Sequence, residues 1–195
     1  GLHRATQMRR QPGSALKPLA VYGPALELGY TTASVLLDEK TSFGGYTPRN
    51  AGDRYYGLVT MRTAIRNSLN TTAVRLLEEI GLDASIQYLN KMGIPTRNSD
   101  RNLSLALGSM TYGVTPVELA AAYVPYANGG IYHQPYCVER IETVDGSNVY
   151  ERKDSGKQVL SAQNAFLMTS LLQSVVSSGT GTRMLAANTP IAGKT

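Results

Sequence analysis

The sequence predicts a mixed α/β (α+β) domain in which helices predominate. Apolar residues recur at helical spacing over much of residues 14–127 and again over residues 162–176. The pattern becomes strand-like over residues 136–144 and 148–152, and the Asp145-Gly146 pair between them is typical of a hairpin turn. A final strand is expected over residues 190–195.

The first predicted helix follows a tight turn at Pro12-Gly13. Ser14 lies at its N-terminus and Lys17 follows three residues later, so both side chains share one helix face. We expect a bend at Gly23-Pro24, because proline lacks a backbone N–H and crowds the preceding turn. The helix is expected to end at Gly29, and its apolar positions are Leu16, Leu19, Ala20 and Leu26.

The other helices are predicted from the same spacing and from capping residues. A long last helix is expected to bury Phe166, Leu167, Leu171 and Leu172. Ordered surface structure is expected over residues 41–57, and mostly loop over 94–114. The expected helices are residues 31–37, 60–67, 72–80, 83–92 with Asp83 as cap, 117–127 after Thr115-Pro116, and 162–176 with Ser161 as cap.

Composition narrows the function classes. The chain has 195 residues and a net charge of +5, with 42% hydrophobic and 17% charged residues, as in an ordinary globular domain. Lysines and arginines are scattered, which indicates a solvated basic surface and not a nucleic-acid interface. No apolar run is long enough to cross a bilayer.

Cysteine and histidine give no indication of a metal or a cofactor. Cys137 is the only cysteine, so no internal disulfide can form, and its strand-like surroundings predict burial. His3 and His133 have no partners at ligand spacing. We therefore predict no metal site and no cofactor.

The Ser14-x-x-Lys17 pair is a candidate nucleophile and base. A serine hydroxyl needs a neighbouring base to take its proton and amide donors to stabilise the oxyanion that forms. Lysine serves as that base when burial or a nearby positive charge lowers its pKa. Two fixed positions alone are a weak signal, since a polar helix start followed by a solvated lysine is common.

Two further motifs follow in order, Ser68-x-Asn70 and Lys194-Thr195. Taken alone, Ser68-Leu69-Asn70 is equally typical of a break between helices. Gly193-Lys194-Thr195 also resembles the end of a phosphate-binding loop, but that motif needs glycine where Asn188 stands and a helix after the threonine.

The three motifs together resemble those of penicillin-binding proteins and class A β-lactamases. The flanking sequence resembles the transpeptidase domain of class A (bifunctional) penicillin-binding proteins in particular, over nearly the whole chain. The segments that carry this resemblance are residues 4–7, Arg10 to Ser14, Thr47-Pro48-x-Asn50, Arg66 to Asn70, Gly113 to Pro116, Tyr123 to Gly130, and Ser178-Gly179-Thr180-Gly181-Thr182.

The resemblance implies a serine D,D-transpeptidase that cross-links peptidoglycan. Ser14 would be acylated by a stem peptide ending in D-Ala-D-Ala, or by a β-lactam, and Lys17 would accept its proton. Ser68 would relay a proton to the leaving nitrogen.

The remaining motif residues would bind the substrate. Asn70 would offer its amide to the substrate backbone and to Lys17. Lys194 would attract the substrate carboxylate and lower the pKa of Lys17, and Thr195 would donate to the same carboxylate.

The resemblance also implies a fold with helices around an antiparallel five-stranded sheet. Of that sheet we expect this chain to contain only the Lys194 strand, so that residues 1–195 form a transpeptidase domain incomplete at both ends. The rest of the domain, as another chain or a further part of a longer protein, is then an expected partner. A membrane anchor and a glycosyltransferase domain would precede this chain, and the protein would work on the extracytoplasmic face of the bacterial cell membrane.

Two other functions fit the same motifs. A β-lactamase needs a carboxylate that activates a deacylating water, and the loops contain no glutamate in a matching position. A penicillin-binding sensor or scaffold would be acylated without turning over a peptide. Apart from these two functions, the chain would be inert if its oxyanion hole, the pair of amide donors that stabilises the oxyanion, were incomplete.

Overall fold

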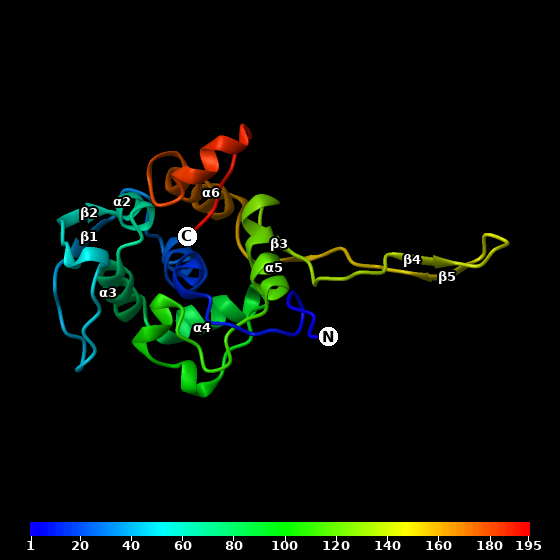
Figure 1. Ribbon diagram of the computed structural model, residues 1–195, viewed down its shortest axis with the longest axis horizontal. Helices are drawn as coiled ribbons and strands as arrows, with labels where there is room; N and C mark the ends of the chain where they lie inside the picture. The colour runs from blue at the N-terminus through cyan, green and yellow to red at the C-terminus, as the bar shows by residue number, and fades with distance from the viewer.

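A computed structural model describes residues 1–195. Helices surround one buried helical segment, and a long hairpin projects to one side (Figure 1). The α-helices are α1 (Gly23–Glu27), α2 (Met61–Arg66), α3 (Asn70–Ile80), α4 (Leu82–Lys91), α5 (Pro116–Ala127) and α6 (Ala162–Ser178). The strands are β1 (Val35–Asp38), β2 (Gly57–Thr60), β3 (Ile131–Tyr132), β4 (Arg140–Glu142), β5 (Asn148–Glu151) and β6 (Lys157–Gln158).

The buried segment changes helix type along its length. Gly13–Leu16 is a 3-10 turn, Pro18–Tyr22 is π-helical, and α1 completes the run. The amide of Gly23 donates to the carbonyl of Pro18 five residues back. Helical conformation thus continues through the Gly23-Pro24 pair, where the helix changes from π to α; the bend expected there stays a prediction.

Side chains from other helices complete the hydrogen bonding of this segment. Pro24 has no N–H to donate to the carbonyl of Ala20, and the Ser85 hydroxyl of α4 donates to that carbonyl at 2.6 Å. The Tyr126 hydroxyl of α5 likewise donates to the carbonyl of Pro18 at 2.9 Å. The irregular helix is therefore fixed in place by its neighbours.

Most of the predicted helices are confirmed, with small shifts at their ends. Thr60 and Ser161 accept hydrogen bonds as the N-caps of α2 and α6. Thr115 and Glu118 form a reciprocal capping box at the start of α5. Asp83 is not a cap, because α4 begins at Leu82 after Gly81, and the Asp83 carboxylate pairs with Arg101.

The predicted short helix over residues 31–37 is wrong. Val35–Asp38 is strand β1, which pairs with β2 in antiparallel register from Val35–Thr60 to Asp38–Gly57. Leu36 and Asp38 are buried on one face of this strand, an alternation that suits a strand and not a helix. Phe166 of α6 was expected in the core but is 72% exposed, whereas Leu171 and Leu172 are buried.

The sheet structure consists of three separate two-stranded pairs, β1–β2, β3–β6 and β4–β5. The five-stranded sheet implied by the resemblance is not formed within this chain, whose structure is mainly the helical part of that fold. The prediction of a strand over residues 190–195 is wrong, since a strand needs a hydrogen-bonded neighbour and none of the chain's strands pairs with this segment.

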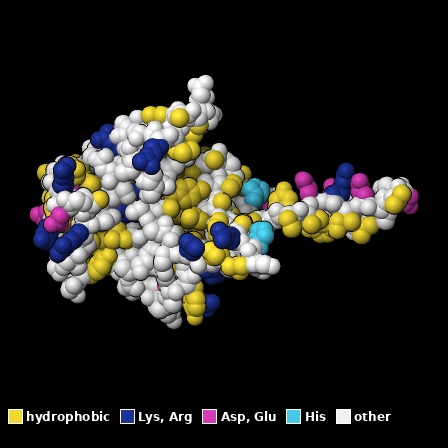
Figure 2. Space-filling model, in the orientation of Figure 1, with side chains coloured by type: hydrophobic (Ala, Val, Ile, Leu, Met, Phe, Trp, Pro, Cys, Tyr) yellow, Lys and Arg dark blue, Asp and Glu magenta, His cyan; other side chains and the backbone are white.

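The β4–β5 hairpin extends away from the core, with side chains exposed along its length (Figures 1 and 2). Cys137 lies in this projecting arm and is exposed, so the prediction of a buried cysteine is wrong. The strand-like pattern was correct, but no second layer covers it.

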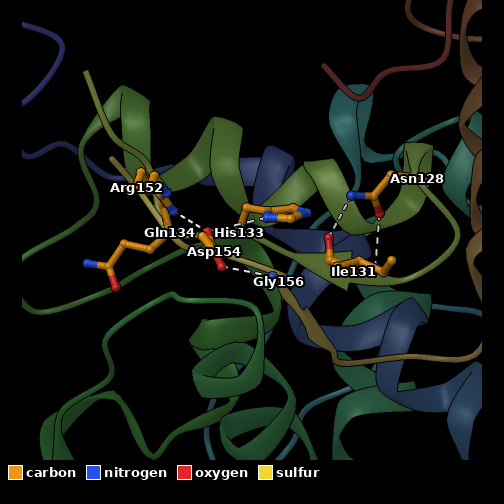
Figure 3. A network of polar contacts seen from close by, with 7 residues as sticks. All are labelled: Asn128, Ile131, His133, Gln134, Arg152, Asp154 and Gly156. Atoms are coloured by element: carbon orange, nitrogen blue, oxygen red, sulfur yellow. Dashed lines mark hydrogen bonds and ion pairs between the residues drawn. The ribbon is translucent and has the colours of Figure 1, made fainter. Parts of the chain in front are cut away.

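Polar contacts fix the base of the arm (Figure 3). Arg152 donates to the carbonyl of Gln134 at 2.9 Å and pairs with Asp154. The Gly156 amide donates to Asp154 at 2.8 Å, and this bond is the largest of the effects that lower the Asp154 pKa to about 2. Nearby, Asn128 exchanges hydrogen bonds of 2.7 and 2.9 Å with the backbone of Ile131.

No helix combines the length and the hydropathy that a membrane-spanning segment requires. No group of three or more His, Cys, Asp or Glu side chains is arranged to hold a metal ion.

Candidate active site

Lys17 is fully buried, and its Nζ lies within hydrogen-bond distance of four acceptors in residues 68–70, one more than the three N–H groups of an ammonium can serve separately. Its Nζ donates to the carbonyls of Ser68 at 2.7 Å and Leu69 at 3.1 Å. It also donates to Asn70 Oδ1 at 2.6 Å and to the Ser68 hydroxyl at 3.3 Å. Two sequence motifs more than fifty residues apart therefore meet at one ammonium group.

Lys194, near the C-terminus of the chain, also contacts the Ser68 hydroxyl. Its Nζ donates to Ser68 Oγ at 2.8 Å and to the carbonyl of Thr195 at 2.5 Å. The hydroxyls of Thr195 and Thr180 are 2.5 Å apart. Ser68 Oγ thus contacts the side-chain nitrogens of both lysines.

Burial changes the acid–base behaviour of both lysines. Two effects together lower the pKa of Lys17 to about 7: desolvation by burial, which is the larger, and the nearby positive charge of Lys194. Burial alone lowers the pKa of Lys194 to about 8. Near neutral pH a large fraction of Lys17 is neutral and able to accept a proton, while most of Lys194 remains charged.

Ser14 lies in the 3-10 turn that precedes Lys17 and is half-buried. Its hydroxyl makes no hydrogen bond to Lys17, whose Nζ is directed to the α2–α3 turn. The carbonyl of neighbouring Ala15 accepts a 2.6 Å bond from the Tyr123 hydroxyl. Tyr123 is a contact of this turn that sequence reasoning missed, and nothing in the spacing of α5 indicates it.

The backbone of Ser68 is unusual. Its φ is +54°, in the left-handed region that residues other than glycine rarely adopt. This conformation directs its carbonyl and its hydroxyl toward Lys17. A polar break between helices was predicted here, and the structure shows that this break has a strained backbone conformation where it contacts Lys17.

Asn70 is the first residue of α3, two positions earlier than the predicted start of that helix. Its amide oxygen accepts from Lys17, and its Nδ2 donates to the carbonyl of Arg49 at 2.6 Å. The amide carries two N–H groups, so one N–H remains for another acceptor.

The Ser14 turn packs directly against a second turn. Gly108, at the end of a 3-10 helix over Leu103–Leu107, has a φ of +78°, and a Cβ there would collide with the backbone of Gly13. We expect Gly108→Ala to lower the free energy of unfolding by more than about 2 kcal/mol, because a left-handed conformation and a backbone collision both oppose the methyl group.

Gly129 provides the matched control for that substitution. It has a similar φ of +79°, and nothing lies within 4 Å of its missing Cβ. Urea denaturation should show a loss of about 1 kcal/mol for Gly129→Ala. Equal losses at the two positions would contradict a close approach between Gly108 and Gly13.

The structure thus brings together Lys17, Ser68, Asn70, Lys194 and Thr195, with Ser14 one turn from Lys17. A serine and a lysine on one helical turn, and a second serine between two lysines, are groups able to take part in acyl transfer.

The family model of the penicillin-binding protein transpeptidase domain matches residues 2–195, and the chain belongs to this family. Penicillin-binding protein 1F of Bacillus subtilis (strain 168) is 45% identical over 183 residues, which cover 93% of this chain and 25% of that protein. Penicillin-binding protein 4 of the same strain is 37% identical over 195 residues, which cover 99% of this chain and 31% of the relative. The chain therefore spans about a quarter to a third of the length of these relatives.

Solved structures show the same fold. The crystal structure of penicillin-binding protein 1A from Haemophilus influenzae has a TM-score of 0.81 and 28% identity, with 94% of this chain and 33% of that chain covered. The D,D-transpeptidase domain of a peptidoglycan glycosyltransferase from Eggerthella lenta has a TM-score of 0.87, with 99% of this chain and 55% of that chain covered. Its sequence identity is 21%, so this likeness shows the fold alone.

Proposed function

We propose that this domain is a serine D,D-transpeptidase that forms an acyl-enzyme on Ser14. The observation that carries the proposal is the Ser68 hydroxyl, which contacts the nitrogens of both Lys17 and Lys194. A buried lysine with a pKa of about 7, one turn after a serine, is suited to accept the proton of that serine.

The first half-reaction releases the terminal D-Ala of a stem peptide. Ser14 Oγ attacks the carbonyl of the penultimate D-Ala and its proton passes to Lys17. When the peptide C–N bond breaks, Ser68 donates its proton to the departing nitrogen and recovers one from Lys17. The products are an ester on Ser14 and free D-Ala, and Lys17 is neutral again.

In the second half-reaction an amine of another stem peptide attacks the ester, which forms the cross-link and restores the Ser14 hydroxyl. The positive charge of Lys194 and the hydroxyl of Thr195 would hold the substrate carboxylate, and the free N–H of Asn70 would meet the substrate backbone. A β-lactam, which has a carboxylate and a reactive carbonyl, would acylate the same serine.

Such a protein would act where peptidoglycan is built, at the extracytoplasmic face of the bacterial cell membrane. The relatives are several times longer than this chain, so the remainder of the transpeptidase domain and an anchoring segment are proposed as parts of the whole protein.

The test uses the full-length protein, a peptide ending in D-Ala-D-Ala and an amine acceptor. The expected result is release of D-Ala together with a cross-linked product, both lost in Ser14→Ala. Stable penicillin labelling without D-Ala release would indicate a sensor or scaffold. Rapid penicillin hydrolysis would indicate a β-lactamase, and either outcome would contradict the proposal.

The pH dependence of the acylation rate should reflect the ionisation of both Lys17 and Lys194. Since Lys17 must be neutral, the acylation rate should rise with pH through about 7, and since Lys194 must be charged, it should fall above about 8. Burial is the main cause of the low Lys17 pKa, but Lys194→Met removes the positive charge that adds to it, so the rise of the rate with pH should move to higher pH. Acylation rates measured with a fluorescent penicillin from pH 5 to about 10 give both the rise at low pH (the acid limb) and the fall at high pH.

Lys194→Arg is the control for this prediction, because it keeps the positive charge. Its acid limb should stay near that of the wild type. An acid limb that does not move in Lys194→Met would contradict electrostatic coupling between the two lysines.

A further inference from the structure

A buried polar pair lies behind the turn that contacts Lys17. Asp38 of β1 is fully buried and Asn50 is 6% exposed. Asn50 Oδ1 accepts hydrogen bonds from the backbone amides of Asn70 at 2.7 Å and Thr71 at 3.2 Å. These are the first two N–H groups of α3, which have no partner within the helix.

Asn50 performs the task that an N-cap side chain usually performs. The N-cap position of α3 is Leu69, whose apolar side chain cannot accept a hydrogen bond. Residue 50 supplies the acceptor from twenty residues away, and so the start of α3 is anchored to the 41–57 segment.

Asp38 fixes the orientation of the Asn50 amide. Asn50 Nδ2 donates to Asp38 Oδ1 at 2.7 Å and to the carbonyl of Arg54 at 2.9 Å. Asp38 also accepts from the Tyr56 amide at 2.9 Å and from the Thr71 hydroxyl. Since a carboxylate only accepts, the nitrogen of Asn50 must face Asp38 and its oxygen must face α3.

We infer that Asn50, oriented by Asp38, is a positioning residue that holds the Ser68–Asn70 turn against Lys17. All four acceptors of the Lys17 ammonium belong to residues 68–70, and the amide of Asn70 is bonded directly to Asn50. A shift of the start of α3 therefore moves every partner of Lys17, and with them the hydroxyl that contacts Lys194. The inference rests on the proposed function, because its consequence is a change in acylation.

Asn50→Asp tests this role with a small change of shape. The new carboxylate keeps acceptors for the α3 amides, but it loses the bonds to Asp38 and to the Arg54 carbonyl and places a second carboxylate beside Asp38. We expect the acylation rate of the full-length protein with a fluorescent penicillin to fall at least about tenfold. The double variant Asp38→Asn/Asn50→Asp restores one donor and one acceptor between the two positions, and should recover most of that loss.

Thr71→Val is the matched control for stability. It removes the hydroxyl that donates to Asp38, and leaves the bonds from Asn50 to the α3 amides intact. Thermal unfolding should show that both single variants are destabilised, whereas acylation in Thr71→Val should stay within about threefold of the wild type. Should Asn50→Asp fail to fold, the double variant and Thr71→Val still make the comparison.

Each outcome has one interpretation. Loss of acylation in Asn50→Asp with recovery in the double variant Asp38→Asn/Asn50→Asp supports the inference. If Asn50→Asp does not fold, near-normal acylation in both the double variant and Thr71→Val supports it. Normal acylation in folded Asn50→Asp, a double variant that folds without recovering acylation, or a Thr71→Val as slow as Asn50→Asp would overturn it. A wild-type protein that is not acylated on Ser14 would contradict the proposed function instead.

Discussion

Lys17→Met should slow acylation by penicillin about a thousandfold, the range expected when a general base is lost. The methionine side chain fills most of the buried space of Lys17 but can neither accept the Ser14 proton nor donate to the α2–α3 turn. The rate of label incorporation in the full-length protein measures the loss. It should not recover at high pH, since no ionisable group remains at this position.

Lys91→Met provides the control, because Lys91 is exposed at the last turn of α4. Its acylation rate should equal that of the wild type. A folded Lys17→Met that is acylated within tenfold of the wild-type rate would contradict the assignment of Lys17 as the base.

Ser68→Ala should slow acylation about a hundredfold, because the hydroxyl between the two lysines is the proposed path of the proton to the leaving nitrogen. Stopped-flow measurement of acyl-enzyme formation gives the rate. The backbone of Ser68 has a φ of +54°, so a change in the turn conformation must be separated from loss of the hydroxyl.

Ser68→Gly makes that separation. Glycine adopts a positive φ without strain and also lacks the hydroxyl. The two variants should be equally slow if the hydroxyl is what matters. Near-normal acylation in Ser68→Gly would show that the hydroxyl carries no proton and that the turn alone is important.

The motifs predicted which residues lie close together better than the periodicity predicted the secondary structure around them. Ser14 and Lys17 share a helical turn as expected, and Ser68 and Asn70 meet Lys17. Helix ends marked by Thr60, Thr115 and Ser161 were also predictable, because the capping chemistry is local.

What could not be predicted depends on partners distant in the sequence. The apolar residues near Leu36 suit either a short helix or a strand, and only the presence of β2 beside them decides between the two. Cys137 and Phe166 carry apolar patterns, yet nothing packs over them. The segment that ends in Lys194 has a strand-like sequence without a neighbouring strand.

Asn50 shows the same limitation at the site. Its segment was predicted to be ordered surface structure, whereas the Asn50 side chain is buried and accepts hydrogen bonds from the start of α3. No spacing rule connects residue 50 with residues 70 and 71, because the contact is made across the fold. The role of this asparagine therefore appears only when the hydrogen bonds are known.

The central claim is that Ser14 is the acylated nucleophile, and peptide mass mapping after reaction with a fluorescent penicillin tests it most directly. The account predicts a covalent label on the peptide that contains Ser14 in the wild-type protein, and none in a folded Ser14→Ala variant. A label on another residue, or a folded wild-type protein that takes up no label, would contradict it.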